Sequence, residues 1–320
     1  MSDAAIRVDN LVKVFHSRSS RGSRREIAAV DGLSFSVARG AIFGLLGPNG
    51  AGKTTTLRIL TTLVAPTSGT ARVLDYDVVK QPFEVRRRIV VVIQEHAAEL
   101  LLSVRENLVT FARFHGHRGV EIARRADRVL DQFGLTAEST RKVQDLSGGF
   151  RRRVQVAKVF MVETPIVFLD EFSTGMDPIL KRAVMDLLRQ EAARGRTIVL
   201  TTQVLSEAEE LCHDILIIDK GRQLARGDLN SLKLLTERVY EVTMTFDRMP
   251  ADVEACLGDF QPMRLELNHN TLHVALKEDE SRVLSLVSAL AARGRVLRIE
   301  ISGASLEDIF IELTQKGVRA

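Results

Sequence analysis

The chain has 320 residues, of which 45% are apolar and 27% charged, and its formal net charge is +4 at pH 7. This balance excludes a disordered chain and predicts a soluble protein of two domains, and the near-equality of acidic and basic residues gives no reason to expect nucleic acid. The longest apolar runs are strand-sized, far below the roughly 20 residues of a membrane-spanning helix. Residues 1–15 lack a secretory signal, so we expect a cytoplasmic protein.

Short apolar runs alternate with amphipathic stretches over the first 230 residues, a pattern that predicts the strands and helices of a layered α/β domain. The candidate strands are AIFGLLG, RIVVVI, PIVFLD, TIVLTT and DILIID. The candidate helices are TTTLRILTTLV, residues 179–193 and residues 205–212. Between RIVVVI and PIVFLD, residues 103–162 are mostly helical in pattern. We therefore expect a largely parallel sheet with an inserted helical subdomain at about residues 97–160.

Composition shifts near residue 236, and a second pattern follows. Strand, helix, strand, strand, helix and strand succeed one another, and a final helix begins at Ser305. This is the order of a ferredoxin-like split βαβ unit, and Asn268-His269-Asn270 provides a hairpin turn between its middle strands. We expect an α/β domain at residues 1–236 and a small α+β domain at residues 237–320.

The chemistry begins at GPNGAGKT, residues 47–54. A strand leads in, a helix leads out, and the spacing matches G-x-x-x-x-G-K-[ST], whose backbone N–H groups wrap a phosphate. Lys53 would reach the β and γ phosphates, the Thr54 hydroxyl would hold Mg²⁺, and Thr55 could meet the α phosphate. The alternative is a glycine-rich turn with a surface lysine. The predicted phosphate-binding residues are Gly47, Pro48, Asn49, Gly50, Ala51, Gly52, Lys53, Thr54 and Thr55.

Two carboxylates follow the buried strand candidate IVFLDE, residues 166–171. They come at its carboxyl end, where open α/β sheets bind their ligands. We expect Asp170 to bind the metal directly or through its water, and Glu171 to accept the proton of the attacking water as general base. The pair could also be an ordinary exposed strand end, but the phosphate loop upstream argues against that.

LSGGF, residues 146–150, supplies a second anion-binding device. Ser147 would cap a helix whose first glycines, Gly148 and Gly149, present their N–H groups to a phosphate. These residues, with the motifs above, resemble the ATP-binding subunits of ABC transporters, whose signature is LSGGQ. The resemblance covers about residues 5–230, with the motifs in the family's order. It implies that two subunits face head to tail, so that each signature closes on the ATP held by the other.

Three further residues take their roles from this resemblance. Phe15 stands where an aromatic ring stacks on adenine, and Gln94 where a glutamine senses the metal and the attacking water. Asp177, in STGMD, matches the aspartate of the D-loop. Each has a structural alternative: Phe15 could be plain core, Gln94 a loop amide, and Asp177 a helix cap before Pro178.

Gln203 stands where the family usually carries a histidine that contacts the γ phosphate. An amide can donate a hydrogen bond to an anion but cannot take up a proton near neutral pH. Subunits of the daunorubicin-resistance type also tend to carry glutamine here, so we expect an active enzyme. The alternative is that Gln203 only lines the turn before a capping box at Ser206 and Glu209.

Two other departures leave the phosphate and metal ligands intact. Phe150 replaces the glutamine of the signature, and Phe172 replaces the proline common after the catalytic glutamate. The basic runs Arg86–Arg88 and Arg151–Arg153 lie near predicted helix ends, where we expect them to make surface pairs.

The resemblance implies an ATP-hydrolysing motor subunit of a drug exporter, with ATP and Mg²⁺ as cofactors. It would form a head-to-tail dimer with a second copy of itself. Closure of that dimer would drive export through a separate integral membrane permease. The chain would then lie on the inner face of the cell membrane, and its C-terminal domain would stabilise the dimer or the permease contact. A ligand-sensing role for that domain is the alternative. A soluble ABC ATPase acting on ribosomes or DNA is the competing function, although no nucleic acid is expected.

Overall fold

A computed structural model describes residues 3–18, 24–92, 98–233, 239–258, 260–303 and 305–318. Gln94 lies outside these residues. The chain divides into two compact units, Met1–Arg226 and Gly227–Ala320. Among the described helices, none combines the length and the apolar character that crossing a bilayer requires.

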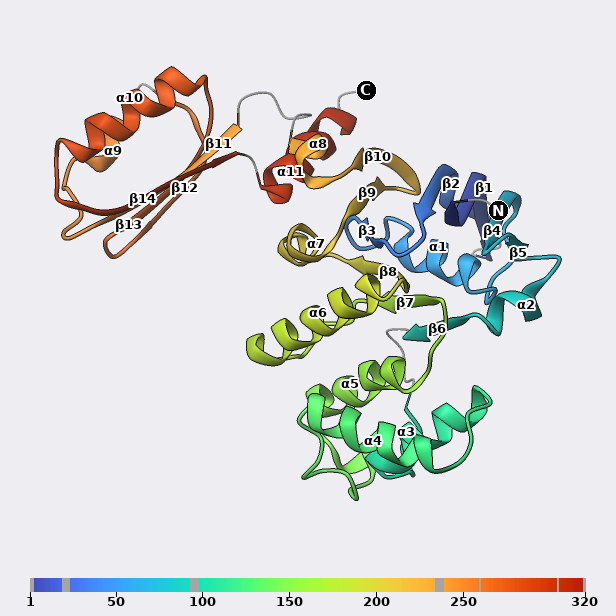
Figure 1. The fold of residues 1–320 in the computed structure, drawn as a ribbon. Helices are drawn as coiled ribbons and strands as arrows, with labels where there is room; N and C mark the ends of the chain where they lie inside the picture. Colours follow the sequence, from blue (N-terminus) through green and yellow to red (C-terminus); the bar gives the residue numbers. More distant parts are fainter. Residues whose placement is uncertain are drawn as a thin grey trace. The chain divides into compact units, whose positions relative to one another are not determined.

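The first unit contains two sheets (Figure 1). The antiparallel sheet has the order β2-β1-β4-β5, with bounds Arg24–Ala38, Ala4–Arg18, Ser68–Val73 and Tyr76–Asp77. The second sheet has the order β10-β9-β3-β8-β7-β6, with bounds Arg222–Gly227, Asp214–Asp219, Ile42–Leu46, Thr197–Thr202, Ile166–Asp170 and Ile89–Val92. The pairs β9–β3, β3–β8, β8–β7 and β7–β6 are all parallel, which confirms the predicted parallel sheet.

Apolar side chains alternate across the second sheet between two cores. In β7, Val167 and Leu169 belong to the core on the side of the inserted helices, whereas Ile166 and Phe168 belong to the core shared with the antiparallel sheet and α1. Every residue of β7 is buried. Parallel strands that are buried on both faces need apolar side chains on both faces, so they appear in the sequence as continuous apolar runs. PIVFLD and TIVLTT are recognisable for this reason.

Outside the segment between β6 and β7, the described residues of this unit form the helices α1 (Lys53–Leu60), α2 (Pro82–Arg86), α6 (Pro178–Ala193) and α7 (Leu205–Leu211). Between β6 and β7 come α3 (Val104–Phe114), α4 (Val120–Gln132), η1 (Val143–Asp145), α5 (Gly148–Ala157) and η2 (Lys158–Met161). Figure 1 shows this green group gathered beyond β6, the edge strand of the sheet. A capping box at Ser103 and Glu106 fixes the start of α3.

The second unit is built on one antiparallel sheet of the order β12-β13-β11-β14. Its elements are α8 (Leu229–Lys233), β11 (Val239–Phe246), α9 (Val253–Cys256), β12 (Pro262–Asn268), β13 (Thr271–Lys277), α10 (Glu280–Ala291), β14 (Val296–Gly303) and α11 (Leu306–Val318). The turn expected at residues 268–270 joins β12 to β13, with His269 at φ +49°. Because α8 packs on α11, the units divide after Arg226, earlier than the boundary expected at residue 236.

Candidate functional site

The loop between β3 and α1 curls so tightly that two of its glycines have no room for a side chain. A Cβ at Gly47 would lie 2.2 Å from the carbonyl oxygen of Ile218, and one at Gly52 would lie 2.2 Å from that of Ala29. Gly52 also has φ +104°, a conformation that glycine adopts without strain. The glycine spacing of residues 47–54 is thus required by the neighbouring backbone.

Lys53 begins α1 and folds its side chain back into this loop. Its Nζ donates hydrogen bonds to the carbonyl oxygens of Gly47, at 2.6 Å, and Pro48, at 3.0 Å. Burial lowers the pKa of Lys53, and the nearby carboxylates of Glu171 and Asp170 oppose that shift. The ammonium therefore lies within the loop, in the field of the two acids that the sequence predicts for catalysis and metal binding.

Asp170 ends β7 with its side chain directed at the start of α1. Its Oδ2 lies 3.3 Å from the Thr54 hydroxyl, although 116 residues separate the two in the chain. Thr201, opposite Asp170 in the β7–β8 register, donates a second hydroxyl hydrogen bond to the same carboxylate. The structure thus brings Lys53, Thr54 and Asp170 together, and it adds Thr201, which carried no motif in the sequence.

Glu171 follows with an unusual backbone. Its φ is +48°, in the left-handed region that non-glycine residues rarely adopt, and its N–H donates to the carbonyl oxygen of Thr201 at 3.0 Å. Arg152 donates to the carbonyl oxygens of Asp170, Glu171 and Phe172. The expectation that Arg152 makes a surface pair is therefore wrong, because its side chain is buried against the turn that carries Glu171.

Gln203 is exposed one residue beyond the end of β8, at the same sheet edge as Asp170. The Thr202 hydroxyl accepts a hydrogen bond from Val204 N–H at 2.9 Å and lies 3.2 Å from Glu207 Oε2. Helix α7 begins at Leu205, and its N-cap, Val204, has no side-chain hydrogen bond. The capping box considered for Ser206 and Glu209 is therefore wrong, because the helix starts before Ser206.

The signature, residues 146–150, forms a second group with the D-loop, residues 173–177. Ser147 caps α5, and its Oγ accepts a hydrogen bond from Phe150 N–H at 3.4 Å. A Cβ at Gly149 would lie 2.8 Å from the carbonyl oxygen of Gly175, whereas Gly148 faces open space. These contacts leave the amino end of α5 pressed against the D-loop, with Gly148 open to a ligand.

Asp177 caps α6, as the structural alternative proposed, and it also contacts the signature helix. It accepts a hydrogen bond from Leu180 N–H at 3.0 Å and pairs with Arg153 at 2.7 Å. The Leu180 N–H lowers the pKa of this carboxyl most, and Arg153 lowers it further. The role that the family resemblance gives Asp177 therefore remains compatible with its role as a cap.

Phe15 lies on β1 beside Ile27 of β2, and its side chain is 42% exposed. The Lys13 ammonium lies 5.0 Å from its ring centroid. This exposure excludes the alternative that Phe15 is plain core. A flat aromatic face at the surface of the antiparallel sheet is suited to stacking on a base.

Comparison with known proteins decides the family. The model of the family described as ABC transporter matches residues 30–174. The chain is 36% identical to the daunorubicin/doxorubicin resistance ATP-binding protein DrrA of Streptomyces peucetius over 97% of this chain and 92% of that protein. The chain belongs to the ABC transporter family, as an ATP-binding subunit.

Two further proteins are similar to this ABC subunit. It is 34% identical to the Nod factor export ATP-binding protein I of Paraburkholderia xenovorans (strain LB400), over 98% of each chain. A dimeric ATP-binding cassette solved in a post-hydrolysis state with ADP and Pi superposes with a TM-score of 0.64, at 24% identity, over 70% of this chain and 98% of that one. That likeness confirms the fold of an ABC ATPase for the ATP-binding part of this subunit.

Proposed function

We propose that this chain is the ATP-hydrolysing motor subunit of an ABC exporter. It couples ATP-driven closure of a dimer to export through a separate membrane permease. The observation that carries this proposal is the meeting of Lys53, Thr54, Asp170 and Glu171 at one edge of the parallel sheet. A phosphate loop beside two carboxylates at this edge is the arrangement that phosphoryl transfer requires.

The loop and its neighbours are suited to hold Mg·ATP. Backbone N–H groups at the start of α1 and the Lys53 ammonium would neutralise the phosphates, and Thr55 would meet the α phosphate. Phe15 would stack on adenine. The Thr54 hydroxyl and the Asp170 carboxylate offer the oxygen ligands that Mg²⁺ prefers, and they already lie 3.3 Å apart. Gln94, outside the described residues, stays a predicted further ligand.

Hydrolysis needs a base for the attacking water. Glu171 follows the metal-binding Asp170 directly and lies near Lys53, so its carboxylate can take the proton beside the terminal phosphate. Gln203, at the end of the neighbouring strand, would donate its amide hydrogen to the γ phosphate. Bound Mg²⁺ would supply neutralisation of the charge that develops on the phosphate oxygens.

A second copy of the chain would complete each site. The amino ends of α5 and α6 carry Ser147, Gly148, Gly149 and Asp177. Gly148 faces open space, so the N–H groups at the start of α5 can meet an anion. We infer that they close on the nucleotide held by the partner copy, head to tail. The dimeric state of the superposed cassette supports this arrangement.

The names of the relatives support proposals for the permease, the export direction and the location. Their names describe resistance to daunorubicin and doxorubicin and export of a Nod factor. We propose that this subunit likewise docks on an integral membrane permease, peripherally at the cytoplasmic face. The cargo would then be selected by the permease. The names of these relatives do not favour ribosomes or DNA as the target.

The accessory parts are proposed to serve the same motor. The helices between β6 and β7 would form the inserted helical subdomain that carries the signature. The strand order β12-β13-β11-β14, with α9 and α10, supports the proposal of a ferredoxin-like domain. We propose that this domain stabilises the dimer or the permease contact, with ligand sensing as the alternative, because such folds host many functions.

The test is the Glu171→Gln variant with Mg·ATP. We expect its hydrolysis rate to fall by about 10²- to 10⁴-fold while ATP binding is retained, so that the closed dimer accumulates. Size-exclusion chromatography with light scattering, with and without the copurified membrane partner, measures the dimer. The control is Glu163→Gln, the same change at an exposed carboxylate before β7. A Glu171→Gln protein that stays monomeric with Mg·ATP and its permease would contradict the proposal.

A further inference from the structure

Arg152 lies on α5, five residues after Ser147, with its side chain only 8% exposed. Its Nη2 donates to the carbonyl oxygens of Asp170 and, at 2.8 Å, of Glu171, while its Nε donates to that of Phe172 at 3.3 Å. A single guanidinium therefore contacts three successive carbonyl groups. The planar guanidinium of arginine makes this possible, because it spreads its N–H donors over three nitrogens. The donors of lysine all lie on one nitrogen.

Those three carbonyls form the turn in which the general base is placed. Glu171 has φ +48°, a strained conformation that persists only where the surroundings hold it. On one side, Glu171 N–H donates to Thr201 of β8. On the other side, Arg152 holds the carbonyls. The direction of the Glu171 side chain therefore depends on a contact made from the signature helix.

Two further contacts join the same helix to the segment after Glu171. The backbone of Gly149 lies against Gly175, so that an added Cβ would come within 2.8 Å of its oxygen, and Arg153 pairs with Asp177 at 2.7 Å. Together with Arg152, these contacts connect the start of α5 to residues 170–177. A displacement of the signature would therefore be transmitted to the turn that carries Glu171.

We propose that Arg152 is a positioning residue, which sets the orientation of Glu171 from the signature helix of the same chain. This inference rests on the proposed function, in which Ser147 engages the nucleotide of the partner copy and Glu171 acts on the nucleotide of its own. Through Arg152, closure of the signature on one ATP would align the base at the other. The two sites of the dimer would in this way be coupled through α5.

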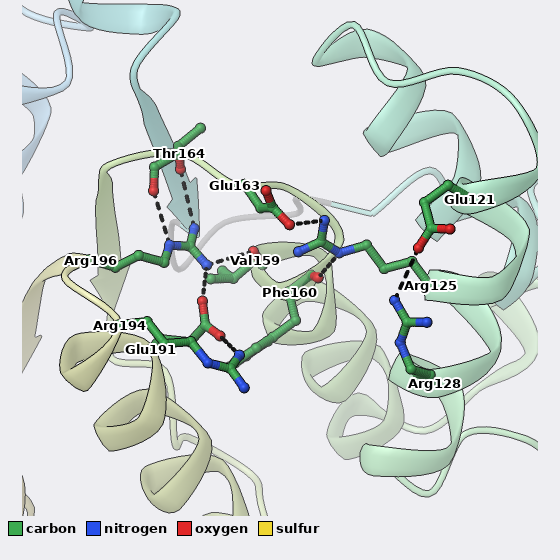
Figure 2. A network of polar contacts seen from close by, with 10 residues as sticks. All are labelled: Glu121, Arg125, Arg128, Val159, Phe160, Glu163, Thr164, Glu191, Arg194 and Arg196. Carbon is green, nitrogen blue, oxygen red and sulfur yellow. Dashed lines mark hydrogen bonds and ion pairs between the residues drawn. The ribbon is translucent and has the colours of Figure 1, made fainter.

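Arg196 provides a matched control (Figure 2). It is also 8% exposed, and it donates to the carbonyl oxygens of Thr164, at 2.9 Å, and Val159, at 3.4 Å. Its partner Glu191 lies 2.7 Å away. Arg196 thus anchors the chain before β7, at the opposite end of the strand from Glu171. Replacing it removes a comparably buried guanidinium without touching the turn that holds the base.

The experiment compares Arg152→Gln, Arg152→Lys and Arg196→Gln in the full chain, with kcat, the Kd for Mg·ATP and Tm as readouts. We expect Arg152→Gln to lower kcat by about 10- to 100-fold with the Kd nearly unchanged, because small misplacements of a catalytic group cost rates of this size. Arg152→Lys should recover part of the loss. Arg196→Gln should lower Tm by a similar amount but leave kcat within about twofold of wild type.

A double variant separates positioning from general damage. If Arg152 acts through Glu171, then Arg152→Gln should cause no further loss of kcat in a Glu171→Gln background, because the two effects are not additive. Additive losses, a full kcat in Arg152→Gln, or an equal loss in Arg196→Gln would each overturn the inference. A Glu171→Gln protein with the wild-type rate would instead overturn the proposed function, so the two failures are distinguishable.

Discussion

At the scale of single residues, Gln203 carries a prediction about the pH dependence of ATP hydrolysis. It lies just beyond β8, where the family usually has histidine, and its amide does not titrate. We expect the kcat of the wild-type ATPase to show no acidic limb near pH 6.5, the usual histidine pKa. Rates measured between pH 5.5 and 8 with saturating Mg·ATP check this. An acidic limb that disappears in Gln203→Ala would show that the prediction is wrong.

Lys158 makes a second residue-scale prediction. Burial lowers the pKa of its ammonium to about 8, against a partial opposing effect from Glu99. Below pH 8 the folded chain holds Lys158 as a buried charge, which lowers the free energy of unfolding. Above pH 8 the folded chain releases this proton, whereas the unfolded chain still holds it. The destabilising effect of Lys158 therefore diminishes as the pH rises. We expect Lys158→Met to raise the free energy of unfolding at pH 7 by on the order of 2–3 kcal/mol, and by less at pH 10.

Urea denaturation at the two pH values measures this difference. The control is Lys142→Met, the same change at an exposed lysine just before η1. A gain for Lys158→Met that is equal at pH 7 and pH 10 would mean that burial of the charge is not its cause.

At the scale of elements, the register of β7 against β8 builds the catalytic edge. Asp170 pairs with Thr201, so the hydroxyl and the carboxylate meet as soon as the two strands align. A shift of register by one residue would turn every side chain to the other face. The positions of Asp170 and Gln203 therefore depend on the parallel pairing of two strands that are recognisable in the sequence as apolar runs.

The start of α5 offers a matched pair of glycines. Gly149→Ala would place a Cβ 2.8 Å from the Gly175 oxygen, whereas Gly148→Ala would meet nothing within 4 Å. We expect Gly149→Ala to lower the free energy of unfolding by about 1–3 kcal/mol through this backbone clash. Gly148→Ala should be neutral or slightly stabilising, since alanine favours helix. Thermal unfolding of both variants tests this, and equal Tm values would contradict it.

At the scale of the whole molecule, the described residues of the nucleotide site all belong to the first unit, which ends at Arg226. The fragment 1–236 keeps β10, the edge strand of the six-stranded sheet, which ends at Gly227. We expect this fragment to bind Mg·ATP with a Kd within about threefold of the full chain, because domains with their own cores fold alone. Fluorescent-nucleotide titration measures it. A fragment that is folded by circular dichroism but does not bind would show that the C-terminal residues contribute to the site.

The sequence by itself determined the α/β class of the first unit and the tight loop of residues 47–54. Buried parallel strands appear as continuous apolar runs, and the glycine spacing of residues 47–54 reflects a local backbone requirement, so both signals lie within short stretches. The positions of α6 and α7 agree with the sequence prediction for the same reason. Local signals of this kind do not depend on knowing what lies across the molecule.

Only the tertiary structure decided the contacts between distant segments. Arg152 was expected at the surface within a basic run, and it is buried because its fork meets three carbonyls of a turn 18 to 20 residues away. Thr201 carries no motif, yet strand pairing aims it at Asp170. A side chain's partners are set by how the elements pack, and packing brings together residues whose separation in the chain leaves no local pattern.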